Sequence, residues 1–127
     1  IGDIRAGFEH SLCIARDAGI DDSCVILDPG FGFGWKHERN FEILRRLPEL
    51  WNLGLPLLVG PSRKSSIGSL LRLPVDHRVE GTATAVALAI AGGADIVRVH
   101  DVAEMVRVAR VADAVVRANW SDTPESQ

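Results

Sequence analysis

The chain has 127 residues, of which 46% are hydrophobic and 24% charged, and its formal net charge is −3. This size fits one domain of an ordinary soluble globular protein, and the dispersed charge argues against a nucleic-acid or membrane-surface role. No apolar run approaches the ~20 residues that cross a bilayer. Two unclustered cysteines, Cys13 and Cys24, predict buried reduced thiols in a cytoplasmic protein.

The chain opens with a predicted helix, strand and loop. Apolar residues at helical spacing predict a helix over residues 4–18, closed by Gly19. The run Cys24–Leu27 is too short for a helix and too apolar for a half-exposed strand, so it predicts a buried parallel strand. Glycines and a proline exclude regular structure over residues 29–34.

The middle of the chain predicts two helices around a second strand. A helix with one apolar face resumes near Glu38 and reaches residues 50–51, with Pro48 as a point where it kinks or stops. Leu55–Gly60 predicts a strand, and Ser65–Leu71 predicts a short helix.

The last part predicts a loop over Arg72–His77, a helix over Val79–Ala91, a strand over Ala94–His100 and a helix over Val102–Ala118. The first of these helices is apolar almost all round, which predicts burial on both sides. The polar segment 121–127 predicts a disordered tail.

Helices therefore alternate with three parallel strands, which is the pattern of an α/β fold. Three strands cannot close a barrel, since small barrels use about eight, and both outer strands would be left as apolar edges. The chain also begins with Ile1 rather than Met. We therefore expect a piece of a larger protein.

Polar residues follow each strand at similar spacing: Asp28 to Lys64 is 36 residues, and Lys64 to Arg98 is 34. Each interval has the length of one strand and its return helix. The carboxyl ends of parallel strands lie side by side, so a carboxylate, an ammonium and a guanidinium should converge on one rim.

Asp28 precedes a Pro-Gly pair. Taken alone, this position is typical of an aspartate that caps a turn. The residues after it favour a ligand site, because glycines let the backbone approach a ligand and phenylalanines offer apolar faces to a flat ring. The glycines are Gly30, Gly32 and Gly34, and the aromatic residues are Phe31 and Phe33.

Lys64 follows the second strand in the segment Gly60–Ser65. The segment is not a P-loop, because no glycine precedes the lysine and the loop is too short. A solvated surface lysine is the default interpretation. Its place at the start of a helix instead favours contact with an anion or a carbonyl group.

Arg98 interrupts a buried strand, where an unpaired guanidinium is costly. Either an aspartate forms a structural ion pair with it, or it faces a ligand. His100 points to the same side, because side chains alternate along a strand. Together Arg98 and His100 would form a clamp for phosphate or pyrophosphate.

The motifs Leu27–Gly34, Leu58–Ser65 and Ile96–Asp101 resemble, in order, those of the dihydropteroate synthase family of folate biosynthesis, the target of the sulfonamides. The resemblance implies a partial TIM (β/α)8 barrel of parallel strands with return helices, lacking the N-terminal strands. Residues 1–120 would be the C-terminal part of this pterin-binding barrel, followed by the tail.

The resemblance also implies a reaction in which hydroxymethyl-dihydropterin pyrophosphate loses pyrophosphate and 4-aminobenzoate captures the pterin methylene group. Lys64, Arg98 and His100 would be the catalytic residues. The resemblance implies that the pterin forms a hydrogen bond to Asp28, that Lys64 contacts the oxygen and nitrogen edge of the pterin, and that Arg98 packs on the pterin plane. Arg98 and His100 would bind pyrophosphate. Phe33, Ser65 and the loop after Gly60 would border an aminobenzoate pocket, and Val99 would make a further substrate contact. The largest departure from the family is Trp35, where members usually carry Lys.

Three further expectations rest on the resemblance. The family's Mg²⁺ ligand is an Asn of the first strand, so we expect Mg²⁺ as a cofactor with no metal ligand in this chain. A homodimer through late helices agrees with the apolar run at residues 83–91. The 127 residues alone should bind pterin weakly and show no measurable catalysis.

Two other functions stay open at this point. A folate- or pterin-binding methyltransferase domain resembles the synthase in its barrel and pterin site but needs no pyrophosphate clamp. A non-catalytic pterin-binding or assembly module would use residues 83–91 to dock on a partner chain. A reading frame with five more βα units upstream of Ile1 would support the enzyme, and a genuine start there would support the module.

Overall fold

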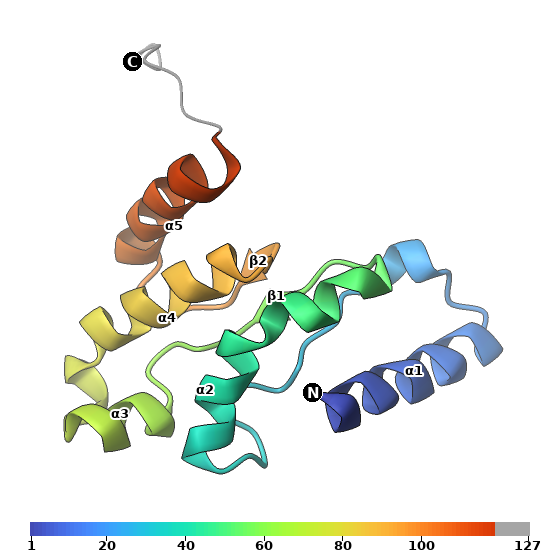
Figure 1. Cartoon of the computed structure of the whole chain (residues 1–127), viewed down its shortest axis with the longest axis horizontal. Helices are drawn as coiled ribbons and strands as arrows, with labels where there is room; N and C mark the ends of the chain where they lie inside the picture. Colours follow the sequence, from blue (N-terminus) through green and yellow to red (C-terminus); the bar gives the residue numbers. More distant parts are fainter. Residues whose placement is uncertain (119–127) are drawn as a thin grey trace.

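The computed structural model describes residues 1–118, apart from the side chains of residues 51 and 52. The predicted tail, 121–127, lies outside the described residues. Figure 1 shows α1 at one end of the molecule, α5 at the other and two short strands between them. The elements are α1 (Gly2–Asp17), α2 (His37–Arg45), β1 (Leu58–Val59), α3 (Ser65–Leu71), α4 (Val79–Ala91), β2 (Ile96–Val97) and α5 (Val102–Arg117), with 3-10 turns at Asp22–Cys24, Leu47–Leu53 and Val75–His77.

The strands are parallel, as predicted. β1 pairs with β2 in the register Leu58↔Ile96, and a single parallel bridge joins Leu27 to Leu57. All three segments are shorter than predicted. Among the described residues, nothing pairs with the outer edge of the first segment or of β2, so each of them has a neighbour on one side only.

The predicted strand Cys24–Leu27 is therefore wrong in extent. Asp21 accepts the N–H of Ser23 and starts a 3-10 turn that ends at Cys24. Ile26 is 51% exposed, because no described element covers its side of the sheet. The prediction of buried thiols is also wrong, since Cys13 and Cys24 are both exposed.

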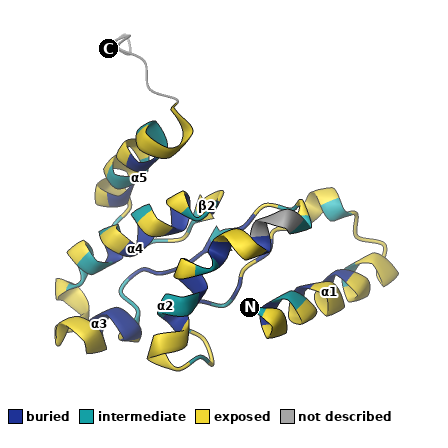
Figure 2. Ribbon diagram, in the orientation of Figure 1, coloured by how far each residue is buried: buried dark blue, intermediate teal, exposed yellow. Residues whose placement is uncertain are grey.

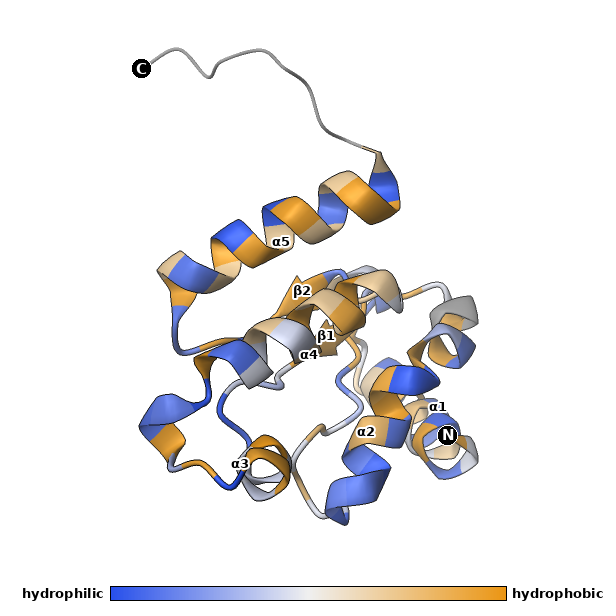
Figure 3. Cartoon of the chain, turned by 60° about the vertical axis from the view of Figure 1, so that its left-hand side comes forward, coloured by the Kyte–Doolittle hydropathy of each residue, from blue (hydrophilic) through white to orange (hydrophobic). Residues whose placement is uncertain are grey.

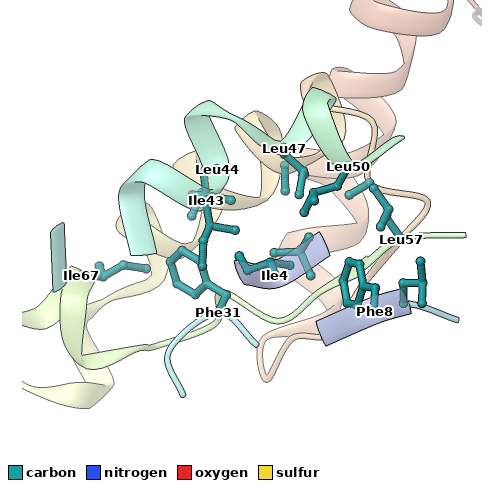
Figure 4. Packing of buried hydrophobic residues seen from close by; sticks show 14 of the residues in the cluster. Ile4, Phe8, Phe31, Ile43, Leu44, Leu47, Leu50, Leu57 and Ile67 are labelled. Carbon is teal, nitrogen blue, oxygen red and sulfur yellow. The ribbon is translucent and has the colours of Figure 1, made fainter. Parts of the chain in front are cut away.

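The main core lies between α1, α2 and the strands, and Figure 4 shows its side chains. In α1, Ile4, Phe8 and Leu12 are buried because a spacing of four residues places them on one face. Residues 29–34 form a loop that we call the glycine loop. Phe31 anchors this loop in the same core, where its side chain is almost fully buried.

The predicted interruption at Pro48 is confirmed. α2 ends at Arg45, and the N–H of Glu49 donates to the carbonyl of Arg46 in a tighter 3-10 turn. Proline has no N–H to continue an α-helix, and its ring collides with the carbonyl of the preceding turn.

Helix α4 packs on α5 through a second core cluster that includes Val86, Ile90 and Met105. Burial on both sides is only partly confirmed, because Leu88 is 55% exposed on a stripe that no described element covers. Figure 2 shows exposed residues along α4 and over most of α5. Figure 3 shows that many residues of both helices are hydrophobic. No helix in the described part of the chain is long and apolar enough to span a membrane.

Candidate functional site

Three loops leave the same edge of the parallel sheet. They follow Leu27, β1 and β2, and they contain Asp28, Lys64 and Arg98 respectively. The N–H of Arg98 donates to the carbonyl of Val59, so the two later loops begin side by side. The parallel order therefore delivers the predicted charged residues to one rim.

The glycine loop is held at both ends by side-chain hydrogen bonds. Asp28 Oδ1 accepts the N–H of Gly30 at 2.8 Å, so this aspartate does cap a turn. The buried side chain of Asn40 accepts the N–H of Gly32 at 2.6 Å and donates to the carbonyl of Lys36 at 3.3 Å. One carboxylate oxygen of Asp28 takes no part in the turn.

Lys64 crosses the glycine loop and ends above an aromatic ring. Its Nζ lies 3.7 Å from the centroid of Phe33, whose side chain is 61% exposed. Partial burial and the nearby charge of Arg98 lower the pKa of Lys64, and the opposite charge of Asp28 resists this shift. Both groups therefore lie within electrostatic reach of the ammonium, as the spacing predicted.

Arg98 lies against Gly60, where a Cβ would come within 3.3 Å of its Nε and Nη2 atoms. The bare backbone of Gly60 thus lets the guanidinium lie close, and a side chain there would make the contact tight. In the described part of the chain, no carboxylate forms an ion pair with Arg98. The described residues therefore supply no structural ion pair for Arg98, and the exposure of the residue in this chain removes the desolvation cost expected for it.

His100 contacts the second loop through Ser62. The buried Ser62 Oγ accepts the backbone N–H of His100 at 3.0 Å and lies 2.8 Å from its Nδ1. Sequence reasoning placed Ser62 only in the loop near the site. Its pairing with His100 spans 38 residues and leaves no local signal.

A second connection between the loops was missed entirely. Asp101 accepts two hydrogen bonds from the Arg63 guanidinium, at 3.0 Å from Nε and 2.5 Å from Nη2. The guanidinium holds the pKa of the Asp101 carboxyl below its ordinary value. The backbone of Arg63 has φ +55°. The N–H of Arg63 donates to the hydroxyl of Thr82, and the guanidinium of Arg78 donates to the carbonyl of Arg63.

The remaining predicted residues lie at the margin of the rim. Ser65 is exposed and starts α3 directly after Lys64. The side chain of Val99 packs on the α4–α5 cluster. Trp35 is half-buried against the core, and its indole N–H donates to the carbonyl of Pro29 at 3.4 Å.

The rim combines a carboxylate that accepts hydrogen bonds with two cations and an imidazole. A carboxylate suits the paired N–H groups of a flat heterocycle, and a guanidinium with an imidazole suits a phosphate. Within residues 1–118, no group of three His, Cys, Asp or Glu side chains is placed to hold a metal ion. These residues therefore offer no fitting ligand set for the Mg²⁺ expected from the sequence.

Comparison with known proteins agrees with this chemistry. A family model described as pterin binding enzyme matches residues 1–100. The chain is 52% identical over 118 residues to the dihydropteroate synthase of Synechocystis sp., covering 92% of this chain and 41% of that protein. It is 47% identical over 116 residues to the dihydropteroate synthase of Clostridium beijerinckii, covering 91% of this chain and 43% of that protein.

Solved structures agree as well. The dihydropteroate synthase of Coxiella burnetii in complex with pteroic acid superposes with a TM-score of 0.89 at 36% identity, over 93% of this chain and 44% of that one. The Yersinia pestis dihydropteroate synthase with a sulfonamide drug complex gives a TM-score of 0.90 at 42% identity, over 93% of this chain and 43% of that one. The chain thus spans less than half the length of these relatives.

Proposed function

This chain belongs to the family of pterin-binding enzymes, and from that premise we propose that the protein carrying it is a dihydropteroate synthase. We also propose that the chain forms the last three strands of a (β/α)8 barrel with their return helices. The observation that carries the proposal is the meeting of Asp28, Lys64 and Arg98 on one rim. Active sites of such barrels lie at this face, where the strands end.

The pterin would lie flat on this rim. The carboxylate of Asp28 accepts hydrogen bonds from the N–H edge of the pterin, and Lys64 donates to its oxygen and nitrogen edge. The guanidinium of Arg98 packs on the ring plane. Gly32 and Gly60 support this arrangement, because the absence of side chains there leaves room for Lys64 and Arg98.

The chemistry would need little from the chain beyond binding and charge. The bond between the pterin methylene carbon and the pyrophosphate oxygen breaks, and its electron pair leaves with pyrophosphate. The amine of 4-aminobenzoate then forms the new C–N bond and loses a proton. Arg98 and His100 stabilise the negative charge that develops on the leaving group, which lowers the barrier.

Phe33 and Ser65 would border the 4-aminobenzoate pocket. Both residues are exposed next to Lys64, Phe33 on the glycine loop and Ser65 at the start of α3, and this supports the placement. A Mg²⁺ requirement and a cytoplasmic location stay predictions. A homodimer through the late helices is also proposed, and the exposed apolar residues of α4 and α5 support it.

The alternative functions predict different chemistry. A pterin-binding methyltransferase does not require Arg98 and His100 to hold a pyrophosphate, whereas both lie beside the proposed pterin position. An assay of the full-length protein with the pterin pyrophosphate and 4-aminobenzoate tests the proposal. We expect release of pyrophosphate together with dihydropteroate. Methyl transfer without pyrophosphate release, or pterin binding without turnover, would favour one of the alternatives.

A further inference from the structure

The hydroxyl of Ser62 has two neighbours on the same histidine. It accepts the backbone N–H of His100 at 3.0 Å, and its Oγ lies 2.8 Å from the ring Nδ1. Ser62 is buried, with 4% of its surface exposed. The hydroxyl proton therefore needs an acceptor within the protein.

Within residues 1–118, the only acceptor in hydrogen-bond contact with that proton is His100 Nδ1. A serine hydroxyl has one proton to donate, and the backbone N–H already occupies one of its lone pairs. Donation from Oγ to Nδ1 satisfies both partners. A neutral imidazole that accepts at Nδ1 must carry its own proton on Nε2.

We propose that Ser62 is a positioning residue that holds neutral His100 in its Nε2–H tautomer, with Nε2–H as the donor for the pyrophosphate oxygens. The identity of the ligand, pyrophosphate, rests on the proposed function. The tautomer rests only on the contact between Ser62 and His100.

The backbone contact makes the arrangement specific. In the register of β1 and β2, Ser62 lies opposite His100, three residues beyond the Val59↔Val97 pair. The serine hydroxyl thus replaces a carbonyl in the continuing ladder and simultaneously holds the ring. A histidine held in this way can donate to an anion without first becoming protonated.

The first experiment reads the tautomer directly. Ring 15N chemical shifts of His100 are measured at pH 8 in the full-length protein labelled with 15N-histidine. We expect the Nε2–H form in the wild type and a mixture of tautomers in Ser62→Ala. Ser62→Thr keeps the hydroxyl and should keep the Nε2–H form.

Ser66→Ala is the matched control. Ser66 is also buried and lies four residues away, but its hydroxyl has no hydrogen-bond partner among the described residues. Its removal should leave the His100 shifts unchanged. Inorganic pyrophosphate is then titrated against all four proteins, and Ser62→Ala alone should bind about fivefold more weakly, the worth of one ordinary hydrogen bond.

The outcomes separate the two proposals. A wild-type ring protonated on Nδ1 overturns the inference, and this measurement needs no variant to fold. Unchanged shifts or unchanged affinity in Ser62→Ala also overturn it. A wild-type protein with the Nε2–H form that binds no pyrophosphate contradicts the proposed ligand and function, while the hydrogen-bond assignment stands.

Discussion

The side chain of Lys64 passes directly over the backbone of Gly32. A Cβ added to Gly32 would lie 2.5 Å from Lys64 Cδ and 2.9 Å from its Cε. Gly32 also has φ +82°, a conformation that residues with a side chain rarely adopt. The position of the ammonium above Phe33 therefore depends on a glycine in the neighbouring loop.

Gly32→Ala should displace Lys64 and weaken the binding of a pterin analogue, measured by calorimetric titration. Gly34→Ala is the matched control, because Gly34 also has positive φ, at +71°, but a Cβ there meets nothing within 4 Å. Both variants carry the backbone strain, and only the first carries the collision. Equal losses of affinity in the two variants would contradict the steric explanation.

Asn40→Ala should destabilise the protein and loosen the glycine loop. The buried amide of Asn40 is the acceptor for the Gly32 N–H, and its removal leaves that donor without its partner. A loss of about 1–3 kcal/mol in the free energy of unfolding is expected. Urea unfolding of the full-length protein measures it, and an unchanged midpoint would show that the loop does not depend on this contact.

Loss of the Arg63–Asp101 pair should alter stability in acid. Because Arg63 lowers the pKa of folded Asp101, the carboxylate contributes stability above the unfolded value of about 3.9, and this contribution disappears as the pH falls through the lower folded value. Asp101→Asn should lower the stability at pH 7 and flatten its decline below about pH 4.

Thermal unfolding between pH 2 and pH 7 checks this prediction. Glu104→Gln is the control, because its carboxylate forms only an exposed contact with Arg107 at 3.9 Å on the same helix. A wild-type pH profile in Asp101→Asn would mean that the pair contributes nothing to folding.

The helices were predicted closely because their signals are local. The bounds of α3 and α4 agree with the sequence prediction residue for residue. A regular spacing of apolar residues and the loops at either end suffice to define such segments. The lengths of the strands were overestimated, because the length of a strand depends on its pairing with a distant segment. Leu27, for example, pairs with Leu57, and the local sequence does not reveal how far such a pairing extends.

The convergence of Asp28, Lys64 and Arg98 was predictable from topology alone, since parallel strands end at one edge. The contacts that hold these residues were not predictable. Asp101 lies 38 residues from Arg63, and no spacing rule relates the two positions. Such pairs follow from the register of β1 and β2, which only the folded chain reveals.

Leu88→Glu tests the proposed dimer. Leu88 lies on the exposed stripe of α4, and a carboxylate buried there in an interface would be costly. We expect light scattering to give a dimer for the wild-type full-length protein at micromolar concentration and a monomer for the variant. Leu70→Glu is the control, since Leu70 is also exposed, at 67%, but belongs to α3 rather than to the proposed α4–α5 interface, and this variant should stay dimeric. A monomeric wild type would refute the proposal.

The rim itself is tested most directly at Asp28. Titration of a pterin analogue against the full-length wild type, Asp28→Asn and Asp28→Ala compares three states of the same position. Asn keeps an oxygen for the Gly30 N–H, whereas Ala removes both the turn contact and the charge. We expect wild-type binding and a loss of about 1.5–3 kcal/mol in both variants, because each removes the charged acceptor for the ring. Pterin binding that is equally tight in all three proteins would contradict the account.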